Sequence, residues 1–217
     1  MSIYEKLKIL AYAVPYKENN MFSPYPLFSG NIVMKDKDFL ELTQENYHET
    51  IEWYLELMKK RSDDVSSILI MMSSPYRLQF LNMIEDDITQ KEFSEHLAWL
   101  WIDTEFPNQY PQAMLIKLFK KSDKKLLMNK EEIGVFDKLT DKITIYRGLQ
   151  TEKAKKLGLS WTLSREKALW FANRWKKKSK VYSAKIRKED AFAYFRTRGE
   201  EEIVVNPNKL KEVMEVQ

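Results

Sequence analysis

The spacing of apolar residues changes once along the chain, near residue 140. Over residues 43–139 apolar positions recur every three or four residues, which is typical of the buried face of a helix. After residue 140 apolar and polar residues alternate in short runs rich in β-branched and aromatic side chains, the pattern of strands. The change predicts a mainly helical region over residues 1–140 and a β-rich region over residues 141–217, within an α+β fold.

Capping residues mark the expected helix starts. Residues 89–92 (Thr-Gln-Lys-Glu) and 129–132 (Asn-Lys-Glu-Glu) read as capping boxes, and the pair 74–75 reads as a serine N-cap followed by proline. Residues 105–108 break one helix before the next begins at Pro111. Residues 1–35 are poorly patterned, and residues 21–26, with two prolines, read as a loop.

The β-rich region predicts five strands and one helix. The helix is expected to begin at the cap Ser164 and to place Ala168, Phe171 and Ala172 on one face. The strands are expected at residues 143–146, 159–163, 181–186, 191–195 and 202–205.

Polar residues that can carry chemistry stand in or beside three of these strands. Arg147 follows the first strand, and a guanidinium can bind a phosphate through paired hydrogen bonds. Ser160 and Thr162 lie on one side of the second strand, where a hydroxyl can brace a neighbouring group. Glu200 and Glu202 lead into the last strand, and a carboxylate can stabilise the positive charge that develops on a sugar ring during glycosidic cleavage.

In this order the residues resemble the mono-ADP-ribosyltransferases of the arginine–serine–glutamate class, the fold of clostridial and arginine-modifying toxins. The resemblance covers roughly residues 141–217. It is carried by Tyr146-Arg147-Gly148, Ser160-Trp161-Thr162, Ala168-Leu169-Trp170-Phe171-Ala172 and Glu200-Glu201-Glu202-Ile203.

The resemblance implies a small two-sheet β core and NAD as substrate, and we expect the helical region to pack on this core. Glu202 would stabilise the cationic sugar as nicotinamide leaves, Ser160 would hold Glu202, and Glu200 would position or deprotonate the acceptor. Arg147 would bind the NAD phosphates, and Gly148 would lie near the nicotinamide. The implied cofactor-binding set is Arg147, Gly148, Ser160, Trp161, Thr162 and Phe171.

The chain departs from the family pattern in two places. Trp161 stands where the family has a threonine, which changes the expected shape of the nicotinamide pocket. The interval from Arg147 to Ser160 is short, so that the usual intervening helix shrinks to about one turn near residues 152–156.

Structural interpretations compete with these roles. Trp161 and Phe171 are also ordinary core residues, and Arg196 and Arg198 could neutralise the glutamates as purely structural ion pairs. Three function classes therefore remain open: a transferase that uses NAD and a macromolecular acceptor, an NAD glycohydrolase, and a partner-binding inhibitor with a vestigial ribosyltransferase fold. A glutamate at 200 favours a protein arginine as the acceptor.

Composition narrows the site chemistry. The chain has no cysteine and two histidines, His48 and His96, which argues against a zinc centre, and we expect no metal. Residues 141–217 hold 19 Lys and Arg against 10 Asp and Glu, a net charge of +9 that suits an anionic dinucleotide and keeps a nucleic-acid acceptor open. With no apolar run near the length of a membrane span, we expect a cytoplasmic protein, in the producing cell or in a host cell, with no membrane partner.

Overall fold

A computed structural model describes residues 1–20, 24–61, 64–104, 109–149, 157–174 and 180–216. The chain forms two compact units, Met1–His96 and Leu97–Gln217. Helix α5 (Gln90–Asp103) contains the point of division. The predicted boundary at residue 140 marks the change from helices to strands. As a boundary between two domains it stays a prediction.

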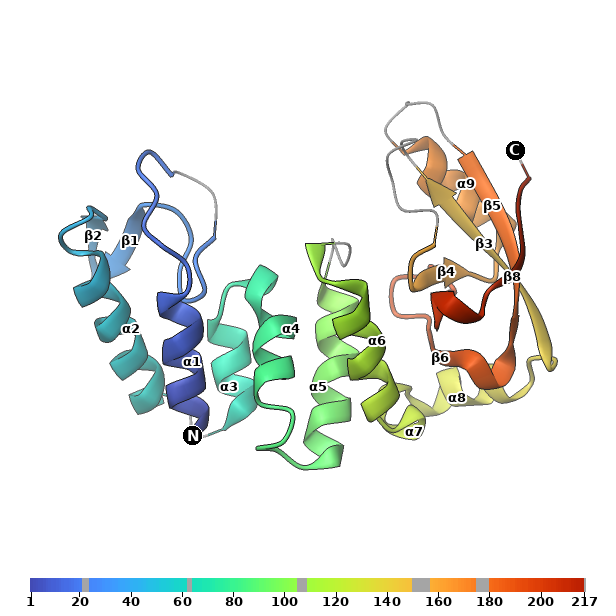
Figure 1. Cartoon of the computed structure of the whole chain (residues 1–217), viewed down its shortest axis with the longest axis horizontal. Helices are drawn as coiled ribbons and strands as arrows, with labels where there is room; N and C mark the ends of the chain where they lie inside the picture. The colour runs from blue at the N-terminus through green and yellow to red at the C-terminus, as the bar shows by residue number, and fades with distance from the viewer. Residues whose placement is uncertain (21–23, 62–63, 105–108, 150–156, 175–179, 217) are drawn as a thin grey trace. The chain divides into compact units, whose positions relative to one another are not determined.

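The N-terminal unit is mainly helical (Figure 1). Its elements are α1 (Ile3–Tyr12), β1 (Ile32–Lys35), β2 (Asp38–Glu41), α2 (Tyr47–Arg61), α3 (Val65–Met71) and α4 (Ser74–Met83). The predicted helices are present, although the cap of α4 is Ser73 rather than Ser74. Residues 1–35, whose sequence is poorly patterned, contain α1 and β1, which the sequence did not predict.

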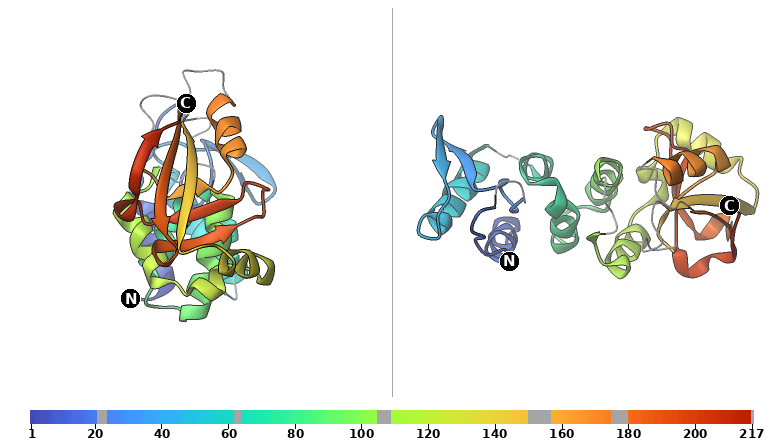
Figure 2. Two further views of the ribbon diagram at one scale, coloured as in Figure 1. Left: turned by 90° about the vertical axis from the view of Figure 1, so that its right-hand side faces the viewer. Right: turned by 90° about the horizontal axis from the view of Figure 1, so that it is seen from above.

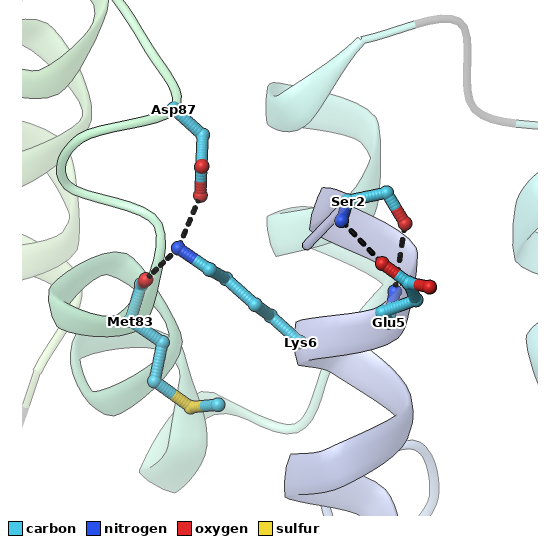
Figure 3. Close-up of polar contacts among 5 residues, drawn as sticks. All are labelled: Ser2, Glu5, Lys6, Met83 and Asp87. Carbon is cyan, nitrogen blue, oxygen red and sulfur yellow. Dashed lines mark hydrogen bonds and ion pairs between the residues drawn. The ribbon is translucent and has the colours of Figure 1, made fainter.

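Helix α1 begins with a capping box that the sequence contains at Ser2 and Glu5. The Ser2 hydroxyl accepts a hydrogen bond from the backbone N–H of Glu5, and the Glu5 carboxylate accepts one from the backbone N–H of Ser2 (Figure 3). Farther along the helix, Lys6 Nζ lies 2.7 Å from the carbonyl oxygen of Met83 and 2.6 Å from Oδ2 of Asp87 (Figure 3). These contacts tie α1 to the end of α4.

The two strands of this unit form a hairpin with a two-residue turn. Asp36 and Lys37 both have positive φ, 52° and 77°, which is the backbone of the turn that suits the twist of an antiparallel pair. Neither residue is glycine or asparagine, so the sequence carries little of the usual hairpin signal.

The C-terminal unit combines short helices with a six-stranded sheet (Figure 1). Its elements after α5 are α6 (Gln112–Lys121), α7 (Lys124–Leu127), α8 (Lys130–Asp137), β3 (Lys142–Leu149), β4 (Ser160–Thr162), α9 (Arg165–Asn173), β5 (Lys180–Arg187), η2 (Lys188–Asp190), β6 (Ala191–Phe195), β7 (Glu202–Val205), η3 (Pro207–Lys209) and β8 (Lys211–Glu215). The five predicted strands and the helix capped by Ser164 are confirmed, and the charged edge strand β8 was not predicted. The break at 105–108 and the short turn near 152–156 lie outside the described residues.

The sheet is antiparallel, with the strand order β6-β7-β4-β3-β5-β8 (Figure 2). All six strands belong to one hydrogen-bonded sheet in place of the expected two-sheet core, and the two-stranded sheet lies in the other unit. The junction between β4 and β3 is a single register pair, Tyr146 with Thr162. Two three-stranded halves therefore meet at this narrow junction.

Helix α9 packs against β3, β4 and β5. Gly148 makes the close approach of α9 and β3 geometrically allowed, because a Cβ at this position would lie 2.1 Å from the carbonyl oxygen of Ala168 and 2.7 Å from the backbone nitrogen of Ala172. Both obstructing atoms belong to the backbone and cannot rotate away. None of the helices in the described ranges has the length and apolar character that a membrane crossing requires.

We predict that Gly148→Ala destabilises the protein by about 1–3 kcal/mol, since α9 must move to accommodate the methyl group. Gly134→Ala, within α8, is the matched control. A Cβ on Gly134 meets nothing within 4 Å, so that this change should be neutral or stabilise by up to about 1 kcal/mol. Denaturant unfolding of both variants measures the effect, and equal stabilities would show that α9 does not pack closely on Gly148.

Candidate active site

The three strands that carry the predicted chemistry are neighbours in the sheet. Strand β4 lies between β7 and β3, with Thr162 opposite Glu202 on one side and opposite Tyr146 on the other. Glu202 is the first residue of β7, and Arg147 follows Tyr146 in β3. Residues far apart in the sequence therefore meet around a strand of only three residues.

Arg147 is fixed by contacts with the strand it adjoins. Its Nη1 donates a hydrogen bond to the carbonyl oxygen of Ser160. The guanidinium lies against Gly158, where a Cβ would be 2.7 Å from Nη2. Within the described residues its buried Nε has no hydrogen-bond partner. The Nη groups retain the donors that a ligand oxygen could reach.

Burial lowers the pKa of Arg147 to about 10, and the nearby charge of Glu202 opposes this effect. The guanidinium therefore stays protonated at neutral pH. A permanent positive charge with unused donors is suited to a phosphate or to another anion.

The carboxyl group of Glu202 is influenced by groups from two other elements. The indole Nε1 of Trp101, in α5, donates to Oε1 over 3.2 Å. The Ser160 side chain, in β4, acts as a hydrogen-bond donor that lowers the pKa of this half-buried carboxyl group.

The pKa of Glu202 is raised to about 7, chiefly because burial disfavours the charged form. The hydrogen bonds from Ser160 and Trp101 and the charge of Arg147 lower the pKa, while the charge of Glu200 raises it. A carboxyl group with this pKa is partly charged at neutral pH. It can accept a hydrogen bond from a sugar hydroxyl or stabilise a nearby cation.

The backbone before Glu202 departs from regular strand geometry. Glu201 has φ 49°, in the left-handed region, so that simple alternation does not relate Glu200 to Glu202. Thr162 Oγ1 donates to the carbonyl oxygen of Glu200 over 2.8 Å and accepts from the backbone N–H of Ser164 over 3.1 Å. Thr162 is buried and engaged in these bonds, which position Glu200 rather than a ligand.

The two arginines that could have neutralised the glutamates do not do so. Arg196 and Arg198 are both exposed, and in the described ranges neither forms an ion pair with Glu200 or Glu202. The backbone N–H of Arg196 instead donates to Oε1 of the buried Glu132, over 2.8 Å. This bond anchors the start of the loop between β6 and β7 on α8.

The aromatic residues of the predicted cofactor set differ in their surroundings. Trp161 is 2% exposed, and its indole N–H donates to the carbonyl oxygen of Gly158 over 2.9 Å. It has no free face for a ligand and acts as a core residue. Phe171 is half-buried beside the exposed Trp170, with an edge-on ring contact of 5.1 Å, and remains accessible to a ligand. Gly148 is explained by the close approach of α9, so that its predicted role near nicotinamide stays a prediction.

The sequence analysis did not identify Trp101. Its position on an amphipathic helix read as core, and its ring is indeed 4% exposed. The only signal available was that a buried indole N–H needs an acceptor. Nothing in the local sequence says that the acceptor lies 101 residues away.

Comparisons of the chain with protein-family models, with curated proteins and with solved structures return no match. In the part of the chain that the structure describes, no group of three or more His, Asp or Glu side chains is arranged to hold a metal ion. We therefore infer function from the residues around β4 and from their geometry.

The raised pKa of Glu202 predicts a specific dependence of stability on pH. Between about pH 5 and pH 7 the folded state retains a proton that the unfolded state has lost, and this contribution to stability is lost as pH rises through about 7. The free energy of unfolding of Glu202→Gln, relative to the wild type, should therefore increase by roughly 2–3 kcal/mol from pH 5 to pH 8.

Denaturant unfolding at several pH values measures this difference. Glu166→Gln, at an exposed position in α9, is the control and should show a much smaller change. A constant difference between Glu202→Gln and the wild type would contradict the burial of the Glu202 carboxylate.

Proposed function

We propose that the protein is a mono-ADP-ribosyltransferase that cleaves NAD, releases nicotinamide and transfers ADP-ribose to a macromolecular acceptor. The observation that carries the proposal is the position of Ser160 between the two other groups. Its carbonyl oxygen accepts a hydrogen bond from Arg147, and its side chain lowers the pKa of Glu202, which lies in the adjoining strand. The proposal also rests on the resemblance of the motif order to the arginine–serine–glutamate class.

The electrostatics of the site suit NAD cleavage. In this reaction the bond between the ribose C1′ and the nicotinamide nitrogen breaks, and both electrons leave with nicotinamide. The ribose is left with oxocarbenium character, which a fixed carboxylate stabilises more than it stabilises the ground state. Glu202 is a half-buried carboxyl group beside Ser160 and can fill this role. The protonated Arg147 then binds the negatively charged diphosphate.

The geometry of the sheet supports a binding site at the same place. Its two three-stranded halves meet at one register pair between β3 and β4, beside Arg147 and Ser160. A substrate that bridges this junction would contact residues from both halves. The two-sheet core of the transferase family corresponds to such a division.

Glu200 is the residue that we assign to the acceptor. It precedes Glu202 by two residues, and its charge influences the Glu202 carboxyl. In the second step the acceptor nucleophile attacks C1′ and loses a proton, which Glu200 can accept. The negative charge of Glu200 would also orient an arginine acceptor. The loop of residues 196–199 lies beside Glu200, where it can contact that acceptor. A protein arginine is therefore the proposed acceptor, and a nucleic-acid acceptor is an outcome of the test.

We predict that Glu202→Gln reduces nicotinamide release from NAD by roughly 100-fold or more, because the amide cannot stabilise the cationic transition state. NAD affinity should change far less, since the amide keeps the size of the carboxylate and one of its two acceptor oxygens. Release of nicotinamide by the purified protein measures turnover, with Glu166→Gln as the active control. Full activity in Glu202→Gln would remove this residue from the chemistry, and an inactive wild type would refute the proposed function.

Glu200→Gln should separate transfer from hydrolysis. Hydrolysis of NAD needs Glu202 alone, whereas transfer also needs a group that orients and deprotonates the acceptor. We predict that acceptor labelling falls at least tenfold more than nicotinamide release in this variant.

The assay uses tagged NAD and a cell lysate, with both products measured in the same sample. Equal loss of the two activities would contradict separate roles for the two glutamates. Nicotinamide release with no labelled macromolecule, even in the wild type, would identify an NAD glycohydrolase. A label that resists protease and is removed by nuclease would identify a nucleic-acid acceptor.

A further inference from the structure

Trp101 is a buried group that the proposed chemistry does not yet use. It lies in α5, in the helical part of the C-terminal unit, and its indole N–H donates to Oε1 of Glu202 over 3.2 Å. An indole has one donor and no acceptor, and it does not titrate in the accessible pH range. The indole can therefore only donate a hydrogen bond. This bond favours an acceptor such as an ionised carboxyl oxygen, or a carboxyl oxygen in a suitable orientation.

The indole ring packs against one of two stacked phenylalanine rings, and the second of these rings belongs to the sheet. Phe119 of α6 meets it edge-on at 4.9 Å, with an angle of 83° between the rings. Phe119 in turn stacks on Phe192 of β6 at 5.5 Å, with an angle of 15°. Strand β6 is paired with β7, on which Glu202 lies. The donor is thus anchored to the same sheet that carries its acceptor, and it has little freedom to turn away.

The groups around the Glu202 carboxyl come from four segments. Ser160 belongs to β4, Arg147 to β3, Trp101 to α5, and Glu200 to the segment just before β7. Among these, Ser160 and Arg147 are in the motif set, and Glu200 faces the acceptor. Trp101 is the one contribution from outside the β-rich region.

We propose that Trp101 is a positioning residue for Glu202, whose indole N–H fixes Oε1 so that the carboxylate faces the reacting sugar. The catalytic role of Trp101 rests on the proposed function, whereas its effect on the Glu202 carboxyl group does not. The part of α5 that carries Trp101 accordingly belongs to the active site and is not only a support for the sheet.

The test is a direct titration of the carboxyl group. Protein labelled with ¹³C in glutamate side chains is followed by NMR over pH 4–9, and the Glu202 signal is assigned as the one missing from Glu202→Gln. Trp101→Phe keeps a packed aromatic ring and removes the N–H. Its Glu202 pKa should rise by roughly 0.5 to 1, because a lost hydrogen bond to the charged form disfavours that form. Trp99→Phe, in the same helix, is the matched control and should leave the Glu202 signal unchanged.

Kinetics supply a second readout. In Trp101→Phe the acidic limb of the pH profile for nicotinamide release should move upward with the carboxyl pKa, and kcat should fall about threefold to tenfold while KM changes less. An unchanged Glu202 titration in a folded Trp101→Phe variant would overturn the proposal. If the wild type does not cleave NAD, the proposed function fails, and the carboxyl titration still decides the role of Trp101.

A measurement on the wild type protects the test against a variant that does not fold. The ¹⁵N–¹H signal of the Trp101 indole should shift with pH through the same midpoint as Glu202, and this shift should vanish in Glu202→Gln. An indole signal that does not respond to pH across this range would overturn the proposal equally.

Discussion

The register of the short strand β4 is the constraint on which the site depends. Thr162 is paired with Tyr146 on one side and with Glu202 on the other, so that one residue sets the alignment of three strands. A slip of one residue on either side would turn the Ser160 side chain to the opposite face of the sheet and break its contact with Glu202. Trp161 opposes such a slip, because its buried ring and its hydrogen bond to Gly158 hold β4 in place.

The same arrangement keeps two opposite charges in a poorly solvated place. Burial acts against the charged form of both Arg147 and Glu202, and each partly offsets the effect on the other. Two such charges contribute little to folding stability compared with apolar packing of the same volume. This electrostatic cost agrees with the proposal that the two residues bind a ligand. Enzymes keep carboxyl groups with raised pKa values where a proton or a cation has to be handled.

Most elements could be predicted from the chain because their signals are local. Strands such as residues 143–146 and the helix capped by Ser164 follow from alternation and capping alone. Helix α1 was missed although Ser2 and Glu5 carry its capping box, and the β1–β2 hairpin was missed because its turn, Asp36-Lys37, lacks glycine. Strand β8 was missed because it is an exposed edge strand rich in charge.

The residues of the candidate site also divide into those with a local sequence signal and those without one. Arg147, Ser160 and Glu202 could be named because each stands at a recognisable point of a short strand. The bond from Trp101 depends on how a helix packs against the sheet, which no local pattern encodes. The engagement of Thr162 with the backbone at Glu200 depends on the left-handed turn at Glu201, an unusual conformation for glutamate.

We propose that NAD binds where β3, β4 and β7 meet. Titration of NAD into ¹⁵N-labelled protein, followed by NMR, reports binding residue by residue and needs neither turnover nor an acceptor. We expect the signals that change to lie around Arg147, Ser160 and Glu202, together with the indole N–H of Trp101. No change up to millimolar NAD, or changes confined to the N-terminal unit, would contradict it.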